Sequence, residues 1–243
     1  MGSKTHVLEV WGDLACFTRP ELKVERFSYP VITPSAARAI FEAVYWKKTF
    51  RWQVEKIEVL KPPRYIALRR NEVKDKVPAS SVASWMAGKE EPIPIYADGD
   101  KNLLGTDQKG RTQRQTMALK DVAYRLHARA VPWPTRENEL AEVWSQFERR
   151  ASHGKCFNQP YFGCREFPAY FRLVENGEES LIPYAMNLDI GFMLYDVFDL
   201  SQPGDSASKP AISLFHAQVN QGILQVPDYS SDEVLRVRGE VSV

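Results

Sequence analysis

The sequence predicts an α+β protein, and three observations support that prediction. Segments in which apolar residues alternate with period two, as in strands, are separated by two segments with the three-to-four-residue spacing of amphipathic helices. Residues 174–243 contain strand-like segments only. The composition, 44% hydrophobic and 26% charged residues over 243 positions, is that of an ordinary globular chain.

The first part of the chain predicts a strand, a helix and a second strand. Residues 6–16 alternate loosely and form the first strand. Thr33 and Pro34 are typical of a helix N-cap and first turn, and this helix should end near residues 45–46. Residues 50–59 alternate again, with a slip in parity at residues 55–56 that predicts a β-bulge.

The next part predicts an insertion and then the mirrored order of elements. Residues 64–118 are rich in proline and glycine and predict an irregular insertion between two strands of one sheet. Residues 119–131 form a clear third strand. Thr135 should cap a second helix that stops near Gly154, and a fourth strand should lie within residues 155–173.

This order of strand, helix, strand, strand, helix and strand is typical of the ferredoxin-like fold, which RNA-recognition modules share. We therefore expect a ferredoxin-like (RRM-like) domain over residues 1–173 with an insertion at 64–118. Residues 174–243 should form a small antiparallel β domain, with a hairpin turn at 220–222 and an edge strand or tail at 232–243.

Charge is distributed unevenly along the chain. Residues 47–70 carry eight basic and two acidic side chains, a balance of +6, and residues 109–133 carry six and one, a balance of +5. Residues 173–208 carry seven acidic side chains and no lysine or arginine. This asymmetry indicates that the basic stretches meet a polyanion, although clustered solvated faces are the alternative on charge alone.

Several classes of protein are disfavoured. The three cysteines are unpatterned, which favours a reducing cytoplasm and does not fit a zinc motif. We see no signal-peptide pattern and no apolar run near the ~20 residues of a membrane span, so we expect a cytoplasmic protein without a membrane partner. Phosphate-binding glycine loops, HExxH and GxSxG are absent from the sequence.

The third strand offers a candidate face for a phosphate backbone. Arg125, His127 and Arg129 share one face of it, and Arg and Lys supply most phosphate contacts. A solvated antiparallel face is the alternative. Together with the basic stretches, this face predicts a set of RNA-binding residues: Lys47, Lys48, Arg51, Arg111, Arg114, Arg125, His127 and Arg129.

Two places offer groups for acid–base chemistry. Tyr45 stands at the end of the first helix, just before the basic run; a phenol is a poor base alone, but neighbouring cations favour its ionised form. A tyrosine packed at the core boundary is the alternative. His153 and Lys155 flank the stop of the second helix, where they can act as acid and phosphate clamp or simply cap the helix.

Four blocks of the sequence resemble a known family: Trp11-Gly12-Asp13, Ile40 to Trp46, Leu119 to Val122, and Gly154 to Phe157 continued by Pro160 to Phe167. In this order they are similar to the CRISPR-associated Cas-five family, subtype d, of type I-C systems, over residues 6–228. That family belongs to the RAMP superfamily, whose ferredoxin-like domain agrees with the order of elements predicted above.

The resemblance implies a pre-crRNA endoribonuclease that cuts the CRISPR repeat hairpin and remains a subunit of the type I-C interference complex. In that family cleavage needs no metal: the ribose 2′-OH attacks the adjacent phosphate and leaves a 2′,3′-cyclic phosphate. The reaction needs a base, a cation and an acid. The family tyrosine at the end of the first helix, matched by Tyr45, and a Lys-His pair near the second helix have these roles.

The sequence departs from the family at the Lys-His pair, where an ungapped alignment places Glu142 and Val143. Either His153, Lys155 or a residue of the basic run 47–51 substitutes, or the protein cleaves weakly. The alternatives are a non-catalytic subunit that binds the crRNA 5′ handle, and a DNase that uses a divalent metal on duplex DNA. We expect Tyr45, His153 and Lys155 to be catalytic, without a cofactor for RNA cleavage.

Overall fold

The computed structural model describes residues 3–74, 77–92, 95, 110–175, 181–204 and 208–236. Its helices are α1 (Pro34–Val44), α2 (Ala79–Met86), the 3-10 turn η1 (Glu137–Glu139) and α4 (Leu140–Ala151). Its strands are β1 (Thr5–Ala15), β2 (Arg26–Phe27), β3 (Phe50–Val59), β4 (Tyr65–Val73), β5 (Arg111–Pro132), β6 (Tyr170–Leu173), β7 (Leu188–Asp196), β8 (Ser213–Asn220), β9 (Ile223–Gln225) and β10 (Val234–Arg236). None of the described helices combines the length and apolar character that a membrane span requires.

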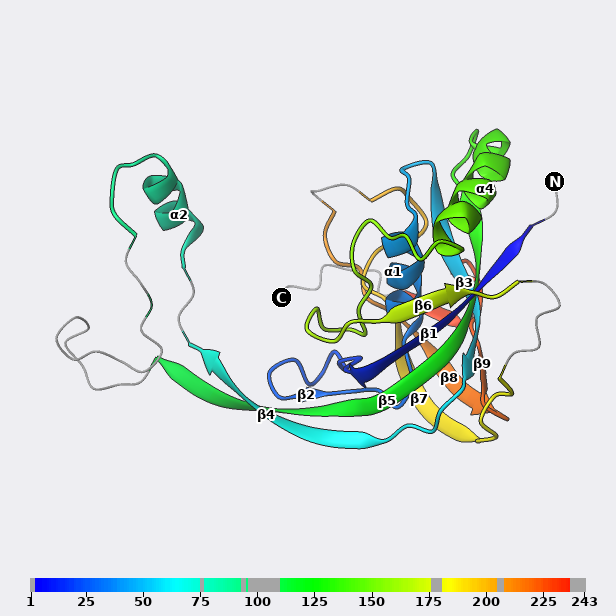
Figure 1. Cartoon of the computed structure of the whole chain (residues 1–243), viewed down its shortest axis with the longest axis horizontal. Coiled ribbons are helices and arrows are strands. Elements are labelled where there is room, and N and C mark those ends of the chain that lie inside the picture. Colours follow the sequence, from blue (N-terminus) through cyan, green and yellow to red (C-terminus); the bar gives the residue numbers. More distant parts are fainter. Residues whose placement is uncertain are drawn as a thin grey trace. The chain divides into compact units, whose positions relative to one another are not determined.

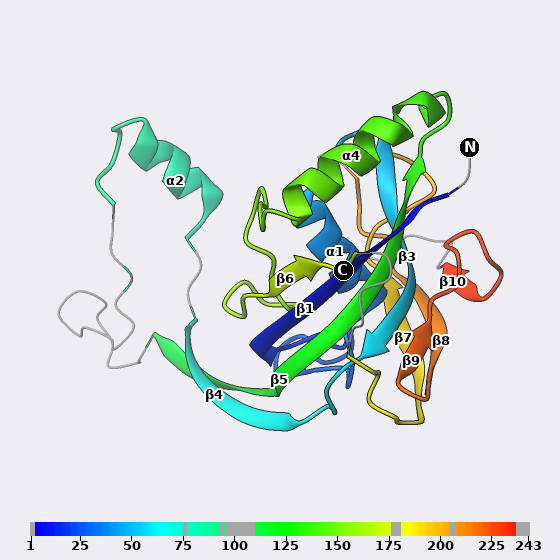
Figure 2. The same cartoon turned by 45° about the vertical axis from the view of Figure 1, so that its right-hand side comes forward.

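The strands form one ten-stranded sheet, and its continuous path runs β10-β8-β9-β3-β5-β1-β6. β1 pairs antiparallel with β5 and β6, and β3 pairs antiparallel with β5 and β9. Figures 1 and 2 show α1 and α4 over one face of β1, β3 and β5. The predicted α+β class is therefore confirmed as a mixed structure dominated by an antiparallel sheet.

The strands after residue 173 continue this sheet. β7 and β10 pair with β8, β8 pairs with β9, and β9 pairs with β3. The sheet thus crosses the domain boundary that the sequence predicts at residue 173. The chain divides into one compact unit of Met1–Ile66 with Met117–Val243 and another of Ala67–Thr116.

The prediction of an irregular insertion over 64–118 is wrong for its described part. β4 occupies Tyr65–Val73 and pairs with β5, which starts at Arg111, well before the third strand predicted at 119–131. Alternation along β4 is real, but arginine, asparagine and glutamate residues fill many of its positions, so the apolar signal is weak. Residues 75–76, 93–94 and 96–109 of this insertion, and 237–243 of the predicted tail, lie outside the described residues.

Local signals fix the start and end of α1. The Thr33 hydroxyl accepts a hydrogen bond from the Ala36 N–H at 3.3 Å, and Pro34 occupies the first turn, as predicted. The helix ends at Val44 because the backbone of Tyr45 is extended. The predicted bulge in β3 is confirmed as a shift in register between Val54 and Lys56.

The second helix begins later than its sequence predicts. Thr135 is not the N-cap; it has a φ of 70°, and a 3-10 turn precedes α4, which starts at Leu140. The predicted end is confirmed, since Gly154 adopts a φ of 62° and its N–H donates to the Ala151 carbonyl. The hairpin turn at 220–222 is confirmed too, with positive φ at both Gln221 and Gly222.

An aromatic core joins both helices to the sheet. Trp52 of β3 lies 5.0 Å from Phe41 of α1 and 4.7 Å from Phe147 of α4, measured between ring centroids. All three side chains are fully buried. Burial of each contributes about 2–3 kcal/mol, so this cluster holds the ends of α1 and α4 in fixed positions.

Candidate nucleic-acid interface

Tyr45 stands at the junction of α1 and β3. Its side chain is 6% exposed and stacks on Phe50, with ring centroids 6.1 Å apart. Its carbonyl accepts a hydrogen bond from Trp52 Nε1 at 2.9 Å. These contacts hold the phenol in one place immediately before the basic run.

Lys47 lies beside this tyrosine and is joined to α4. Lys47 Nζ donates a hydrogen bond to Glu142 Oε1 at 2.7 Å. This hydrogen bond, and a weaker one with the Tyr45 hydroxyl, raise the pKa of Lys47 above its ordinary value. Glu142 therefore holds a charged ammonium next to the phenol. Val143, which the sequence alignment sets at the position of the family histidine, is 1% exposed and belongs to the core.

His153 and Lys155 lie where the sequence predicts, at the end of α4. His153 Nδ1 lies 2.8 Å from a carbonyl oxygen of the last turn, and the Lys155 N–H donates to the Arg150 carbonyl at 2.9 Å. Arg150 Nε in turn donates to the Val44 carbonyl at 2.7 Å, which places this segment next to the end of α1. Within the described part of the chain, however, no hydrogen bond or ion pair joins either side chain to Tyr45.

Three side chains of the first basic stretch gather around one cavity. Lys47, Lys48 and Arg51 line a cavity of 310 Å³ together with Trp133 and Asp199. Burial lowers the pKa of Arg51, although the charge of an acidic neighbour opposes this. The structure thus brings these three predicted RNA-binding residues together near Tyr45.

The second basic stretch is divided between the two compact units. Arg111 and Arg114 are on the part of β5 that belongs to the unit Ala67–Thr116, where Arg111 is exposed and Arg114 is half-buried. Arg125, His127 and Arg129 belong to the other unit. Lys109 lies outside the described residues.

Arg125 forms part of a row of alternating charges across the sheet. In register from β6 to β3, the row contains Arg172, Glu9, Arg125 and Glu58. Arg125 Nη2 lies 2.8 Å from Glu9 Oε1, and its Nη1 lies 2.5 Å from Glu58 Oε2. The Leu181 carbonyl accepts another hydrogen bond from it at 2.6 Å. With its side chain 8% exposed, Arg125 is saturated by these groups and is not the open phosphate ligand that the sequence predicts.

His127 and Arg129 are also occupied. His127 Nε2 lies 2.9 Å from Glu58 Oε1, and burial, with the charge of Lys56, lowers the pKa of His127 to about 4. Burial by itself raises the pKa of Glu58. The hydrogen bond from Lys56 and the charges of the other nearby cations outweigh that effect, so the pKa of Glu58 is lowered overall. Arg129 pairs with Glu55 at 2.9 Å and with a second acid. The predicted phosphate-binding face therefore fits Arg129, whose side chain is 28% exposed, better than it fits Arg125 or His127.

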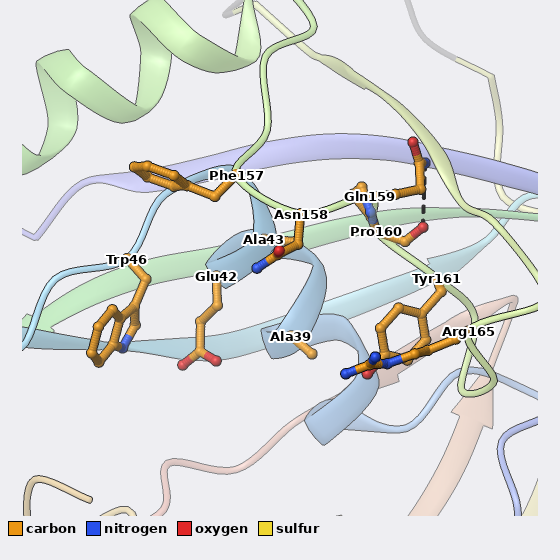
Figure 3. Close-up of a pocket in the computed structure, with 10 residues that line it drawn as sticks. All are labelled: Ala39, Glu42, Ala43, Trp46, Phe157, Asn158, Gln159, Pro160, Tyr161 and Arg165. Atoms are coloured by element: carbon orange, nitrogen blue, oxygen red, sulfur yellow. Dashed lines mark hydrogen bonds between the residues drawn. The ribbon is translucent and has the colours of Figure 1, made fainter. Parts of the chain in front are cut away.

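A second cavity adjoins the basic one. It measures 760 Å³ and lies between α1 and the loop of residues 157–165 (Figure 3). Glu42 and Trp46 line both cavities, so they form the wall between them. The described residues contain no cluster of three or more His, Cys, Asp or Glu side chains suited to a metal ion.

The sequence analysis missed three pairings because they join distant segments. Lys47 and Glu142 are 95 residues apart, and Arg125 is 67 residues from Glu58 and 116 from Glu9. One local signal was available. Glu9 and Glu58 each stand between two buried apolar residues of a strand, so their side chains must point to the opposite face, away from the helices. This alternation does not fix the register between strands, and it is the register that brings these charges together.

Comparison with known proteins identifies the family of this chain. The model of a CRISPR-associated protein family, Cas5d of the Cas5 group, matches residues 5–227. A protein of Mannheimia succiniciproducens named CRISPR pre-crRNA endoribonuclease Cas5d is 41% identical over 236 residues, covering 94% of this chain and 97% of its own length. A protein of the same name from Thermus thermophilus is 39% identical over 243 residues, covering 95% and 94%.

A solved structure supports the same fold. The crystal structure of a CRISPR-associated protein superposes with a TM-score of 0.64 at 19% identity, covering 96% of this chain and 97% of that one. The chain belongs to the Cas5d family, as its sequence blocks indicate.

Proposed function

We propose that this protein is a pre-crRNA endoribonuclease that binds CRISPR repeat RNA and cuts it beside Tyr45. The observation that carries the proposal is the activity named for two relatives at about 40% identity, each aligned over more than nine-tenths of both chains. The repeat RNA is the substrate, and the product crRNA stays bound as the protein joins the other subunits of a type I-C interference complex.

We infer that the four strands β3-β5-β1-β6, with α1 and α4 on one face, form a ferredoxin-like core. Their order supports it, since the two strands of each strand-helix-strand unit are separated by a strand of the other unit. This core brings the end of α1, the start of β3 and the first turn of α4 to one place. Tyr45 and Glu142 come from the end of α1 and the first turn of α4, and Lys47 comes from the connection that leads into β3.

The chemistry follows from that juxtaposition and uses no metal. The Tyr45 side chain, ionised as phenolate, takes up the proton of a ribose 2′-OH and becomes the neutral phenol, while the 2′-oxygen attacks the adjacent phosphorus and the bond to the 5′-oxygen breaks. The Lys47 ammonium stabilises the negative charge that grows on the phosphorane oxygens. The products are a 2′,3′-cyclic phosphate and a 5′-hydroxyl, which takes up a proton. His153 or Lys155 supplies that proton if the RNA bridges from α1 to the end of α4.

The test is single-turnover cleavage of the cognate repeat RNA in excess EDTA. Tyr45→Phe keeps the ring packed on Phe50 and removes only the hydroxyl, so cleavage should fall about 100-fold or more while RNA affinity is retained. Tyr184→Phe, which removes the hydroxyl of an exposed tyrosine elsewhere, is the matched control. Unchanged cleavage by Tyr45→Phe would remove the phenol from the mechanism.

One observation favours a second function, a non-catalytic subunit that binds the crRNA 5′ handle. Glu142 forms an ion pair with the Lys47 ammonium that the phosphorane needs, at 2.7 Å, and the sequence is expected to lack the family Lys-His pair. Glu142→Gln separates the two functions. In a catalyst restrained by this ion pair, the variant cuts faster than the parent and Lys47→Ala cuts slower. In a binding subunit, parent and both variants bind repeat RNA without cutting it.

A further inference from the structure

The cavity between α1 and the loop 157–165 is lined by aromatic side chains that the core does not use. Trp46 is 46% exposed, Phe157 is 62% exposed and Tyr161 is 38% exposed, and all three border the same 760 Å³ hollow. Figure 3 shows them distributed around it, with Trp46 on the α1 side and the other two on the loop. Exposed rings around a concave site indicate a ligand with a flat apolar face.

Polar groups complete the lining. Among the described residues, the Asn158 side chain has no hydrogen-bond partner and Arg165 has no ion pair. Figure 3 shows the Asn158 amide directed toward α1. Glu42 is the one acid of the lining, and it pairs with Arg38 at 2.5 Å. The cavity therefore offers an amide that can donate and accept, a free guanidinium, and no unpaired negative charge.

The loop is built to hold this shape. The Phe157 N–H donates to the Ala43 carbonyl at 2.7 Å, and Gln159 Nε2 donates to the Ala169 carbonyl at 3.0 Å. Arg150 covers one face of the Phe157 ring at 4.0 Å, which leaves the other face for a ligand. A site held in place before binding loses little freedom when the ligand enters.

We propose that this cavity takes one unpaired nucleobase of the bound RNA. The base stacks on the open face of the Phe157 ring, Asn158 meets its hydrogen-bonding edge, and Arg165 meets a flanking phosphate. The proposal rests on the proposed function, since the ligand belongs to the RNA that is cut. Trp46 also borders the hollow of Lys47 and Lys48, so the base lies within a few nucleotides of the scissile phosphate.

The test combines abasic RNA with a ring deletion. Repeat RNAs that carry one abasic nucleotide at each unpaired position are titrated with the parent protein, with Phe157→Ala and with the matched control Phe192→Ala, whose ring is 57% exposed on β7. We expect one abasic position to weaken binding by the parent about tenfold. Phe157→Ala should lose about as much with intact RNA, and nothing further with that abasic RNA. The control should bind like the parent.

A second variant, which leaves the aromatic rings in place, tests the proposal even if Phe157→Ala fails to fold. Arg165→Gln keeps the rings and removes one phosphate contact, so it should reduce the slope of log affinity against log salt by about one and keep the same abasic position sensitive. Two results would overturn the proposal: equal losses at every abasic position in parent and Phe157→Ala, or parent-like affinity of Phe157→Ala for intact RNA. Absence of repeat cleavage by a parent protein that still shows the expected abasic pattern would overturn the proposed activity alone.

Discussion

Replacing Arg125 tests most sharply between the role that the sequence predicts for it and the role that the structure gives it. If Arg125 bound RNA, its replacement would lower the protein's affinity for RNA and leave the fold intact. In the structure its guanidinium lies between Glu9 and Glu58, both with side chains 7% exposed. Arg125→Ala therefore removes the central cation of the row and leaves two buried carboxylates, and we expect its main effect on the free energy of unfolding.

The size of that effect follows from burial. Loss of one partner from a buried ion pair costs about 3–5 kcal/mol, because the remaining charge has neither partner nor water. Glu58 keeps Lys56 at 2.7 Å and Glu9 keeps Arg172 at 2.6 Å, so the lower end, about 3 kcal/mol, is expected. A folded domain is stable by about 5–15 kcal/mol in total, which makes this loss easy to measure.

The loss should depend on pH in a defined direction. The pKa of Glu58 is lowered in the folded protein, so its ionised form contributes stability above its unfolded pKa and loses it as pH falls through the folded pKa. Arg125→Ala removes part of that contribution. The difference in stability between parent and variant should therefore be full at neutral pH and shrink below about pH 4.

Urea unfolding followed by circular dichroism measures the difference, and filter binding measures RNA affinity. Arg129→Ala is the matched control, because its 28% exposed side chain pairs with half-exposed acids and such pairs contribute about 0–1 kcal/mol. An Arg125→Ala protein within 1 kcal/mol of the parent but several-fold weaker in RNA binding would refute the reasoning.

Three further predictions use other parts of the molecule. Burial lowers the pKa of His6 to about 4, partly opposed by Glu148, so its neutral form is favoured and stability should fall by about 2 kcal/mol from this residue as pH drops from 7 to 5; His6→Phe should flatten that part of the profile. Gly163→Ala should destabilise by more than 2 kcal/mol in urea unfolding, because φ is +79° and the new Cβ would lie 2.1 Å from the Cys16 carbonyl oxygen. RNA affinity should fall linearly in log[salt], and Lys48→Gln should reduce the slope by about one; a flat response would exclude an electrostatic interface.

Short-range signals explain why the sequence predicted so many elements. Thr33 and Pro34 start α1, Gly154 ends the turn after α4, and the slip in parity marks the bulge in β3. Each signal lies within a few residues of the feature it specifies. The position of Tyr45 at the end of α1 follows from the same kind of information, and the family blocks around it identify the family.

The tertiary structure alone decided which charges remain available. The sequence places Arg125 and Arg129 on one face, yet only the register of β1, β3 and β5 sets Glu9 and Glu58 on either side of Arg125. The same is true of Glu142, which binds Lys47 across 95 residues. A charge is free or neutralised according to its neighbours within a few ångströms, and in a sheet those neighbours come from other strands, whose register no local pattern encodes.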